Sequence, residues 1–233
     1  MSKCLLCNSN FRRQINYERI FSFAKPKEKF ACSDCLQKFT KKRGLVCSGC
    51  NKEINKKELC SDCVIWQQKY SGNLLDNKAI YQYNEAFHDL MVQYKRYGDY
   101  VLSHVLAELV NSLPKADYYV PIPSSPSHLR KRGFETISSV YQNLVPLTDL
   151  LVKADTKKAQ GEKNRQERLL TKQTFSAIRN KNVRGKILLL DDIYTTGRTL
   201  YHARDALLEA YPNCKINSFT CLLYTSDAAD DKA

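Results

Sequence analysis

The stretch ILLLDDIYTTGRTL, Ile187 to Leu200, decides the fold of this chain. It begins with four apolar residues in a row, a pattern typical of a parallel strand that is covered on both faces. Two adjacent carboxylates, Asp191 and Asp192, follow where this strand ends, and a short turn then leads into a helical pattern. In open α/β sheets, ligands bind beyond the carboxyl ends of the strands. The stretch therefore predicts an α/β fold with a ligand site after this strand.

The residues that follow the strand predict a site for a ribose phosphate. Backbone N–H groups at a helix N-terminus, threonine hydroxyls and a glycine that permits close approach can together hold a phosphate. Asp191 and Asp192 would repel phosphate, but they can hold sugar hydroxyls or a divalent cation that bridges to phosphate groups. The alternative is an acidic strand end before an ordinary helix capped by Thr195 or Thr196. The candidate phosphate loop consists of Thr195, Thr196, Gly197, Arg198 and Thr199.

Helix and strand patterns alternate along the chain from about residue 72. Apolar residues at helical spacing predict helices over residues 85–97, 99–113, 133–145 and 199–211. Strands are predicted over residues 79–83, 117–123, 148–152, 186–193 and 215–223, and the second of these enters a proline-rich loop. This alternation predicts an open, mainly parallel sheet with helices on both faces.

Cysteine spacing predicts a small metal-binding module before this domain. Eight of the ten cysteines form four C-x-x-C pairs, and this spacing lets two thiolates reach one tetrahedral ion. The pairs can share two ions sequentially or as a cross-brace, and the spacing fits both arrangements. Each ion would have four protein ligands, which indicates two structural zinc sites and no catalytic one. The predicted ligands are Cys4, Cys7, Cys32, Cys35, Cys47, Cys50, Cys60 and Cys63.

Charge and composition favour a polyanionic partner. The 233-residue chain has a net charge of +13, and two basic blocks carry the excess. Residues 1–70 hold 15 basic and 6 acidic side chains, and residues 151–186 hold 11 and 3. Such blocks attract nucleic acid, although a solubilising lysine-rich surface has the same composition. The longest apolar runs are too short to cross a bilayer and the N-terminus does not read as a secretory signal, so we expect no membrane insertion and a cytoplasmic location.

Several stretches resemble one known family. ILLLDDIYTTGRTL is similar to the phosphoribosyl pyrophosphate (PRPP) motif of type I phosphoribosyltransferases, and the whole chain resembles the ComF/ComFC competence proteins. Those proteins carry a cysteine-rich module before a phosphoribosyltransferase domain. KRYGDY (Lys95–Tyr100), VPIPSSPSHLRKRGFE (Val120–Glu135) and the basic AQGEKNRQERLL (Ala159–Leu170) resemble further family segments, the last of them a flexible loop.

The resemblance implies a role for each matching residue. Asp191 and Asp192 would hold the ribose hydroxyls and Mg²⁺, and residues 195–199 would hold the 5-phosphate. Ser124 and Ser125 occupy the position of the pyrophosphate loop. Lys131 and Arg132 would pair with pyrophosphate, or would form a solvated basic turn.

Two departures from the family pattern stand out. Glu135 and Thr136 occupy positions where the family has Asn and Gln. The acidic tail YTSDAADDKA, residues 224–233, does not resemble the family, and we expect a translation artefact or a disordered appendage. The predicted organisation is therefore a module over residues 1–66, a phosphoribosyltransferase-like domain over 72–223 and this tail.

Three functions are compatible with these features. The resemblance implies a competence protein that handles single-stranded DNA during uptake in natural transformation and carries a PRPP site. The first alternative is an active phosphoribosyltransferase whose acceptor the sequence does not name. The second is an adaptor whose zinc module binds a helicase-like uptake translocase. Aromatic residues can stack on DNA bases or fill the core, and the candidates are Tyr81, Tyr83, Tyr94, Tyr97 and Phe134.

Overall fold

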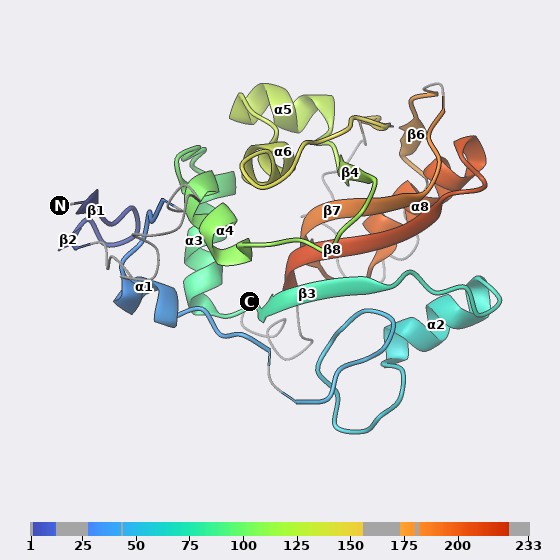
Figure 1. Cartoon of the computed structure of the whole chain (residues 1–233), viewed down its shortest axis with the longest axis horizontal. Coiled ribbons are helices and arrows are strands. Elements are labelled where there is room, and N and C mark those ends of the chain that lie inside the picture. Colours follow the sequence, from blue (N-terminus) through green and yellow to red (C-terminus); the bar gives the residue numbers. More distant parts are fainter. Residues whose placement is uncertain (1, 13–27, 43, 156–172, 180–181, 224–233) are drawn as a thin grey trace, which may run out of the picture.

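A parallel sheet forms the centre of the computed structural model, which describes residues 2–12, 28–42, 44–155, 173–179 and 182–223 (Figure 1). The predicted loop over 159–170 and the tail over 224–233 lie outside these residues. Neighbouring strands pair in the order β3-β8-β7-β4, and every pair is parallel. The four strands are β3 (Asn77–Gln82), β4 (Tyr118–Pro121), β7 (Lys186–Tyr194) and β8 (Lys215–Leu223).

Helices cover both faces of this sheet because β7 is apolar on both sides. Leu188 and Leu190 face one hydrophobic core, and Ile187 and Leu189 face the other. The first core is closed by α3 (Glu85–Lys95), α4 (Leu102–Val110) and α6 (Thr136–Tyr141). The second is closed by α8 (Arg198–Ala210), against which α2 (Ser61–Lys69) packs. The predicted fold class, an open α/β sheet of the phosphoribosyltransferase type behind a cysteine-rich segment, is confirmed.

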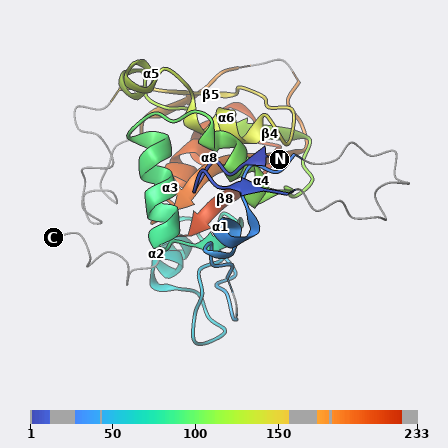
Figure 2. The ribbon, with the colours of Figure 1, turned by 90° about the vertical axis from the view of Figure 1, so that its left-hand side faces the viewer.

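The cysteine-rich segment divides between the two cores. Its first part contains β1 (Ser2–Lys3), β2 (Asn10–Phe11) and α1 (Ser33–Gln37), and it packs on the side of α3 and α4. Its second part runs into α2 and packs with α8. Figure 1 shows α1 and α2 far apart, and Figure 2 shows α1, the β1–β2 hairpin and α4 on the same side of the molecule. The predicted domain boundary between residues 66 and 72 stays a prediction.

Two sequence expectations in the middle of the chain need correction. The predicted proline-rich loop contains a helix, α5 (Pro126–Arg132), because a proline suits its first turn and Gly133, with φ of 82°, ends it. The next helix consequently begins at Thr136 instead of Gly133. The strand predicted over 148–152 forms only in part: beside β4, Leu147 makes a parallel bridge to Tyr119, and Thr148 donates its N–H to the Tyr119 carbonyl at 2.8 Å. Its last residues belong to β5 (Leu151–Lys153), which pairs antiparallel with β6 (Phe175–Ala177), a strand that the sequence pattern missed.

A buried asparagine connects the second part of the cysteine-rich segment to the sheet. Asn77, the first residue of β3, is fully buried, and its side-chain amide donates to the carbonyl oxygen of Cys50 at 3.2 Å. Its side-chain oxygen accepts from the Ser218 hydroxyl at 2.9 Å, and its backbone N–H donates to the carbonyl of Gly49 at 2.9 Å. Because buried amides are costly to leave unpaired, these bonds fix the start of β3 against both neighbours.

In the described residues, no helix is long and apolar enough to cross a membrane.

Candidate functional site

The two carboxylates lie at the carboxyl end of β7, where two helices reach them. Lys95, the last residue of α3, forms an ion pair with the Asp192 carboxylate. Tyr141 of α6 donates its hydroxyl to the backbone carbonyl of Asp191 at 2.7 Å. The Asp191 carboxylate accepts the backbone N–H of Asp192 at 2.9 Å. Both side chains are only partly exposed, so the pair is held in place before any ligand binds.

Burial sets the electrostatics of this pair. Burial, together with the neighbouring negative charge of Asp192, raises the pKa of Asp191 to about 7, and Lys95 and Lys153 oppose this shift. Burial also lowers the pKa of Lys153, although Asp191 and Asp192 favour its charged form. The site is therefore two carboxylates balanced by two lysines. Sequence reasoning missed Lys153, whose position at the end of β5 depends on the hairpin that was not predicted.

The predicted phosphate loop forms a tight turn into α8. Gly197 precedes the helix with φ of 79°, and a Cβ atom there would collide with the ring of Tyr194. A side chain at this position would therefore need both a left-handed backbone and a displaced tyrosine. Thr196 is buried, whereas Thr195, Arg198 and Thr199 are partly exposed. The turn directly follows β7, the strand that carries the carboxylates, and Arg198 and Thr199 are the first two residues of α8.

A tryptophan from the cysteine-rich segment supports this loop. Trp66 of α2, the only tryptophan in the chain, is 2% exposed and donates its indole N–H to the carbonyl of Thr196 at 2.7 Å. Its ring stacks on Tyr201 of α8 with ring centres 4.3 Å apart. Tyr70 also stacks on Tyr201 at 4.9 Å, and the Arg204 guanidinium lies 4.2 Å from the Tyr70 ring centre. Sequence reasoning missed Trp66, although it follows Cys63 by three residues on one helix.

The segment predicted to bind pyrophosphate forms a loop that leads into α5 and is closed by side-chain hydrogen bonds. The backbone N–H of Ser124 donates to the Glu135 carboxylate at 3.0 Å, and the hydroxyls of Ser125 and Ser127 lie 3.1 Å apart. Glu135, which departs from the family pattern, thus connects the start of the loop at Ser124 to the residues that follow α5. Arg132 donates its Nε–H to the carbonyl of Lys95 at 2.9 Å.

Arg132 is connected to the carboxylates through Lys95, because it contacts the backbone of Lys95 and the ammonium of Lys95 contacts Asp192. Lys131 is exposed. A pyrophosphate contact by either residue stays a prediction.

The eight paired cysteines form two clusters in sequential order. Cys4, Cys7, Cys32 and Cys35 make the first and Cys47, Cys50, Cys60 and Cys63 the second, with sulfur atoms within 4.8 Å of one another in each. The sequential pairing is therefore the one that the fold adopts, and the cross-brace is not. Four thiols gathered in this way fit a tetrahedral soft ion such as zinc, which they would hold without an open position.

The two clusters share a local geometry. In the first, the Cys4 sulfur accepts the backbone N–H of Cys32 at 3.3 Å, and in the second the Cys47 sulfur accepts that of Cys60 at 3.4 Å. An asparagine with positive φ follows each first pair, namely Asn8 at 60° and Asn51 at 68°. Asparagine tolerates this left-handed conformation better than most residues do. The repeated C-x-x-C-N pattern in the sequence was the signal for these turns, and sequence reasoning did not use it.

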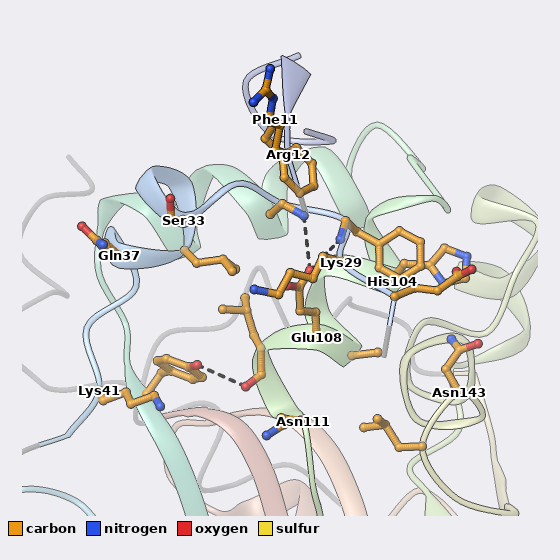
Figure 3. Close-up of a pocket in the computed structure, with 18 residues that line it drawn as sticks. Phe11, Arg12, Lys29, Ser33, Gln37, Lys41, His104, Glu108, Asn111 and Asn143 are labelled. Carbon is orange, nitrogen blue, oxygen red and sulfur yellow. Dashed lines mark hydrogen bonds between the residues drawn. The ribbon is translucent and has the colours of Figure 1, made fainter. Parts of the chain in front are cut away.

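A separate cavity lies between the first cluster and α4 (Figure 3). It measures about 840 Å³. The Glu108 carboxylate accepts the backbone N–H groups of Phe30 and Ala31 at 2.8 and 3.2 Å, and the Phe30 ring stacks on His104 at 4.6 Å. In the described part of the chain, none of the residues predicted to bind PRPP lines this cavity. Its Glu108 contacts fix the first cluster to α4.

Replacement of a cluster cysteine should remove one metal ion. We expect elemental analysis of the purified protein to find two zinc ions per wild-type chain and one in Cys60→Ser. Because α2 begins at this cluster and carries Trp66, the tryptophan emission of Cys60→Ser should also shift to longer wavelength. Cys214→Ala, which removes a buried thiol outside the clusters, should keep both ions. Two ions in Cys60→Ser would contradict the assigned second site.

The raised pKa of Asp191 predicts a stability that falls as pH rises. Between the unfolded pKa of about 4 and the folded value of about 7, the native state binds the extra proton, so this group's contribution is lost as pH increases through that window. Asp191→Asn abolishes this titration. Between pH 5.5 and pH 8, the free energy of unfolding of the wild type, measured in urea, should therefore fall by about 2 kcal/mol relative to that of Asp191→Asn. A difference that does not change with pH would refute the assignment.

Comparison with known proteins gives the chain its family. No family model matches it. It is 31% identical over 236 residues to competence protein ComFC of Bacillus subtilis (strain 168), covering 94% of each chain. It is 34% identical over 213 residues to competence protein ComFC of Streptococcus pneumoniae, covering 89% of this chain and 94% of that one. Competence protein F of Haemophilus influenzae is 24% identical over 200 residues, covering 73% and 87%. With these relatives and this fold, the chain belongs to the ComFC family of competence proteins.

Proposed function

We propose that this protein acts in DNA uptake during natural transformation, where it binds single-stranded DNA and carries a site for PRPP and Mg²⁺. The observation that carries the PRPP proposal is the meeting of three features at the end of β7. These features are the carboxylate pair, the Lys95 ammonium that contacts Asp192, and the glycine turn into α8. The names of the relatives support a role in competence.

Each group has a distinct task in this proposal. Asp191 and Asp192 accept hydrogen bonds from the ribose hydroxyls, and their charge suits a divalent cation held between protein and phosphate oxygens. Residues 195–199 hold the 5-phosphate through backbone N–H groups and hydroxyls at the start of α8. Ser124, Ser125, Lys131 and Arg132 hold the pyrophosphate. When bound, Mg²⁺ would neutralise the phosphate charges.

The two basic blocks supply the DNA-binding charge in this proposal. Several of their lysines and arginines lie in the described residues, among them Arg12, Lys29, Lys41 and Arg184, and many others lie in residues 13–27 and 156–172, outside them. Contacts of this kind neutralise phosphates and release counterions, so binding should weaken steeply as salt rises. An adaptor that only binds a helicase-like translocase lacks this salt dependence towards DNA.

The remaining parts of the proposal concern organisation. Zinc is the metal that we assign to both cysteine clusters, since four thiolates without an open position favour it. We place the protein in the cytoplasm, beside the uptake machinery. The module over 1–66, the domain over 72–223 and the non-family tail over 224–233 are retained as proposed boundaries. Transfer of the phosphoribosyl group to an acceptor is the alternative activity of the same site.

Calorimetric titration with PRPP and Mg²⁺ tests the ribose-phosphate site. We expect the wild type to bind and Asp191→Ala/Asp192→Ala to lose at least tenfold in affinity, since the ribose hydroxyls and the cation lose their ligands. Asp89→Ala/Glu209→Ala removes two exposed carboxylates elsewhere and should bind like the wild type. A repeat with short single-stranded DNA measures any coupling of the two ligands. No binding by the folded, zinc-loaded wild type would refute the PRPP site and leave the DNA-binding and adaptor functions.

Trp66→Phe tests whether the second cluster supports the phosphate loop. The variant keeps a ring against Tyr201 but loses the N–H that the Thr196 carbonyl accepts. A hydrogen bond of this kind contributes about 1 kcal/mol, so we expect PRPP affinity to fall roughly fivefold while zinc content stays at two. Unchanged PRPP affinity would show that the loop holds its shape without Trp66.

A further inference from the structure

Two aromatic side chains are exposed at one turn of the molecule. Tyr97 is 72% exposed and Tyr100 is 42% exposed, and in the described residues no other Phe, Tyr or Trp is classed as exposed. Val101, next in the chain, is 48% exposed. Of the other aromatic residues considered for stacking, Tyr81 and Tyr94 are buried in the core. Exposed rings gathered at one place indicate a binding surface more strongly than scattered ones do.

The backbone of this turn is held in a defined shape. It connects α3 to α4, and Gly98 adopts a φ of 74°. The N–H of Tyr97 donates to the carbonyl of Val92 at 3.2 Å, and that of Asp99 to Gln93 at 3.2 Å. The Tyr100 ring packs edge-on against Phe134, with centres 5.2 Å apart, and its hydroxyl accepts from the Gln142 amide at 3.1 Å. The Tyr100 ring, fixed in this way, loses little conformational freedom when a ligand binds.

Basic residues lie in the two segments that meet at this turn. Arg96 precedes Tyr97 and is exposed, as is Lys131 in the last turn of α5. Phe134 follows that turn by two residues, so its contact with Tyr100 places α5 next to the tyrosines. Arg132 joins the two segments through its bond to the carbonyl of Lys95. Asp99 is the acidic residue within the turn itself.

We propose that Tyr97 and Tyr100 form a stacking surface for the bases of single-stranded DNA, with Arg96 contacting its phosphates. Stacking on aromatic rings beside basic side chains is how proteins bind single strands without sequence preference. This inference rests on the proposed DNA binding, and it locates base contacts outside both basic blocks. Lys95, the last residue of α3 before this turn, contacts Asp192, which connects the proposed surface to the ribose-phosphate residues.

Fluorescence anisotropy with a labelled oligothymidine of about 20 nucleotides tests the surface. Tyr97→Ala should weaken binding roughly tenfold, the loss expected when one stacked base loses its ring. Tyr97→Trp should restore it, because any large aromatic ring offers a stacking face. Ile65→Ala, which truncates an apolar side chain of 48% exposure on α2, should bind like the wild type. An oligomer of abasic sugar phosphate should bind wild type and Tyr97→Ala equally weakly.

The salt dependence separates the two kinds of contact. Tyr97→Ala should keep the wild-type slope of affinity against salt, whereas Arg96→Gln should reduce it, because only the second change removes a phosphate contact. Tyr97→Ala should also keep PRPP affinity and both zinc ions, which shows an intact fold. If the wild type binds no oligothymidine, the proposed DNA binding itself fails. If it binds and Tyr97→Ala binds equally tightly, only the stacking surface is overturned.

Discussion

Burial of β7 on both faces is the constraint on which the rest of the structure depends. Its alternating apolar side chains enter two separate cores, so helices must cover both sides of the sheet. Asp191 and Asp192 lie in the last four residues of β7, past the end of β4, where Lys95 and Tyr141 reach them from the covering helices. The candidate site is thus a product of the same burial that stabilises the fold.

The cysteine-rich segment is part of this arrangement, because each of its clusters contributes to a different core. Cys4 and Cys35 pack with α3 and α4, whereas Cys47, Cys50 and Cys63 pack near α8. A segment with few large aliphatic residues would gain stability from a metal held by its cysteines, in addition to the sheet that it contacts. The second cluster also orders α2, which brings the indole of Trp66 to the phosphate loop. Metal binding far from the carboxylates can therefore influence the shape of the loop.

The sequence predicted the strongly patterned parts of the structure. The unbroken apolar run of β7, the amphipathic helices and the four cysteine pairs each depend on local spacing, and all are present. Contacts between distant segments were not predictable, because Trp66, Lys153 and Tyr141 reach the site through tertiary packing. The sequence pattern did not predict the helix over Pro126–Arg132, because Pro121, Pro123 and Pro126 together are typical of a loop. The exposure of individual tyrosines was not predictable either. Nothing in the sequence distinguishes Tyr94 from Tyr97, but the structure buries Tyr94 and exposes Tyr97.

The ion pair between Lys95 and Asp192 has a consequence for selectivity. A tethered ammonium already serves as counterion to the carboxylates, so a free divalent ion must displace it or share the charge. A lone cation gains little from that exchange. A cation that arrives with a phosphorylated ligand brings compensating negative charge. The displaced Lys95 ammonium can then pair with the phosphate. The resting site would therefore discriminate against bare metal and favour a metal that is already complexed.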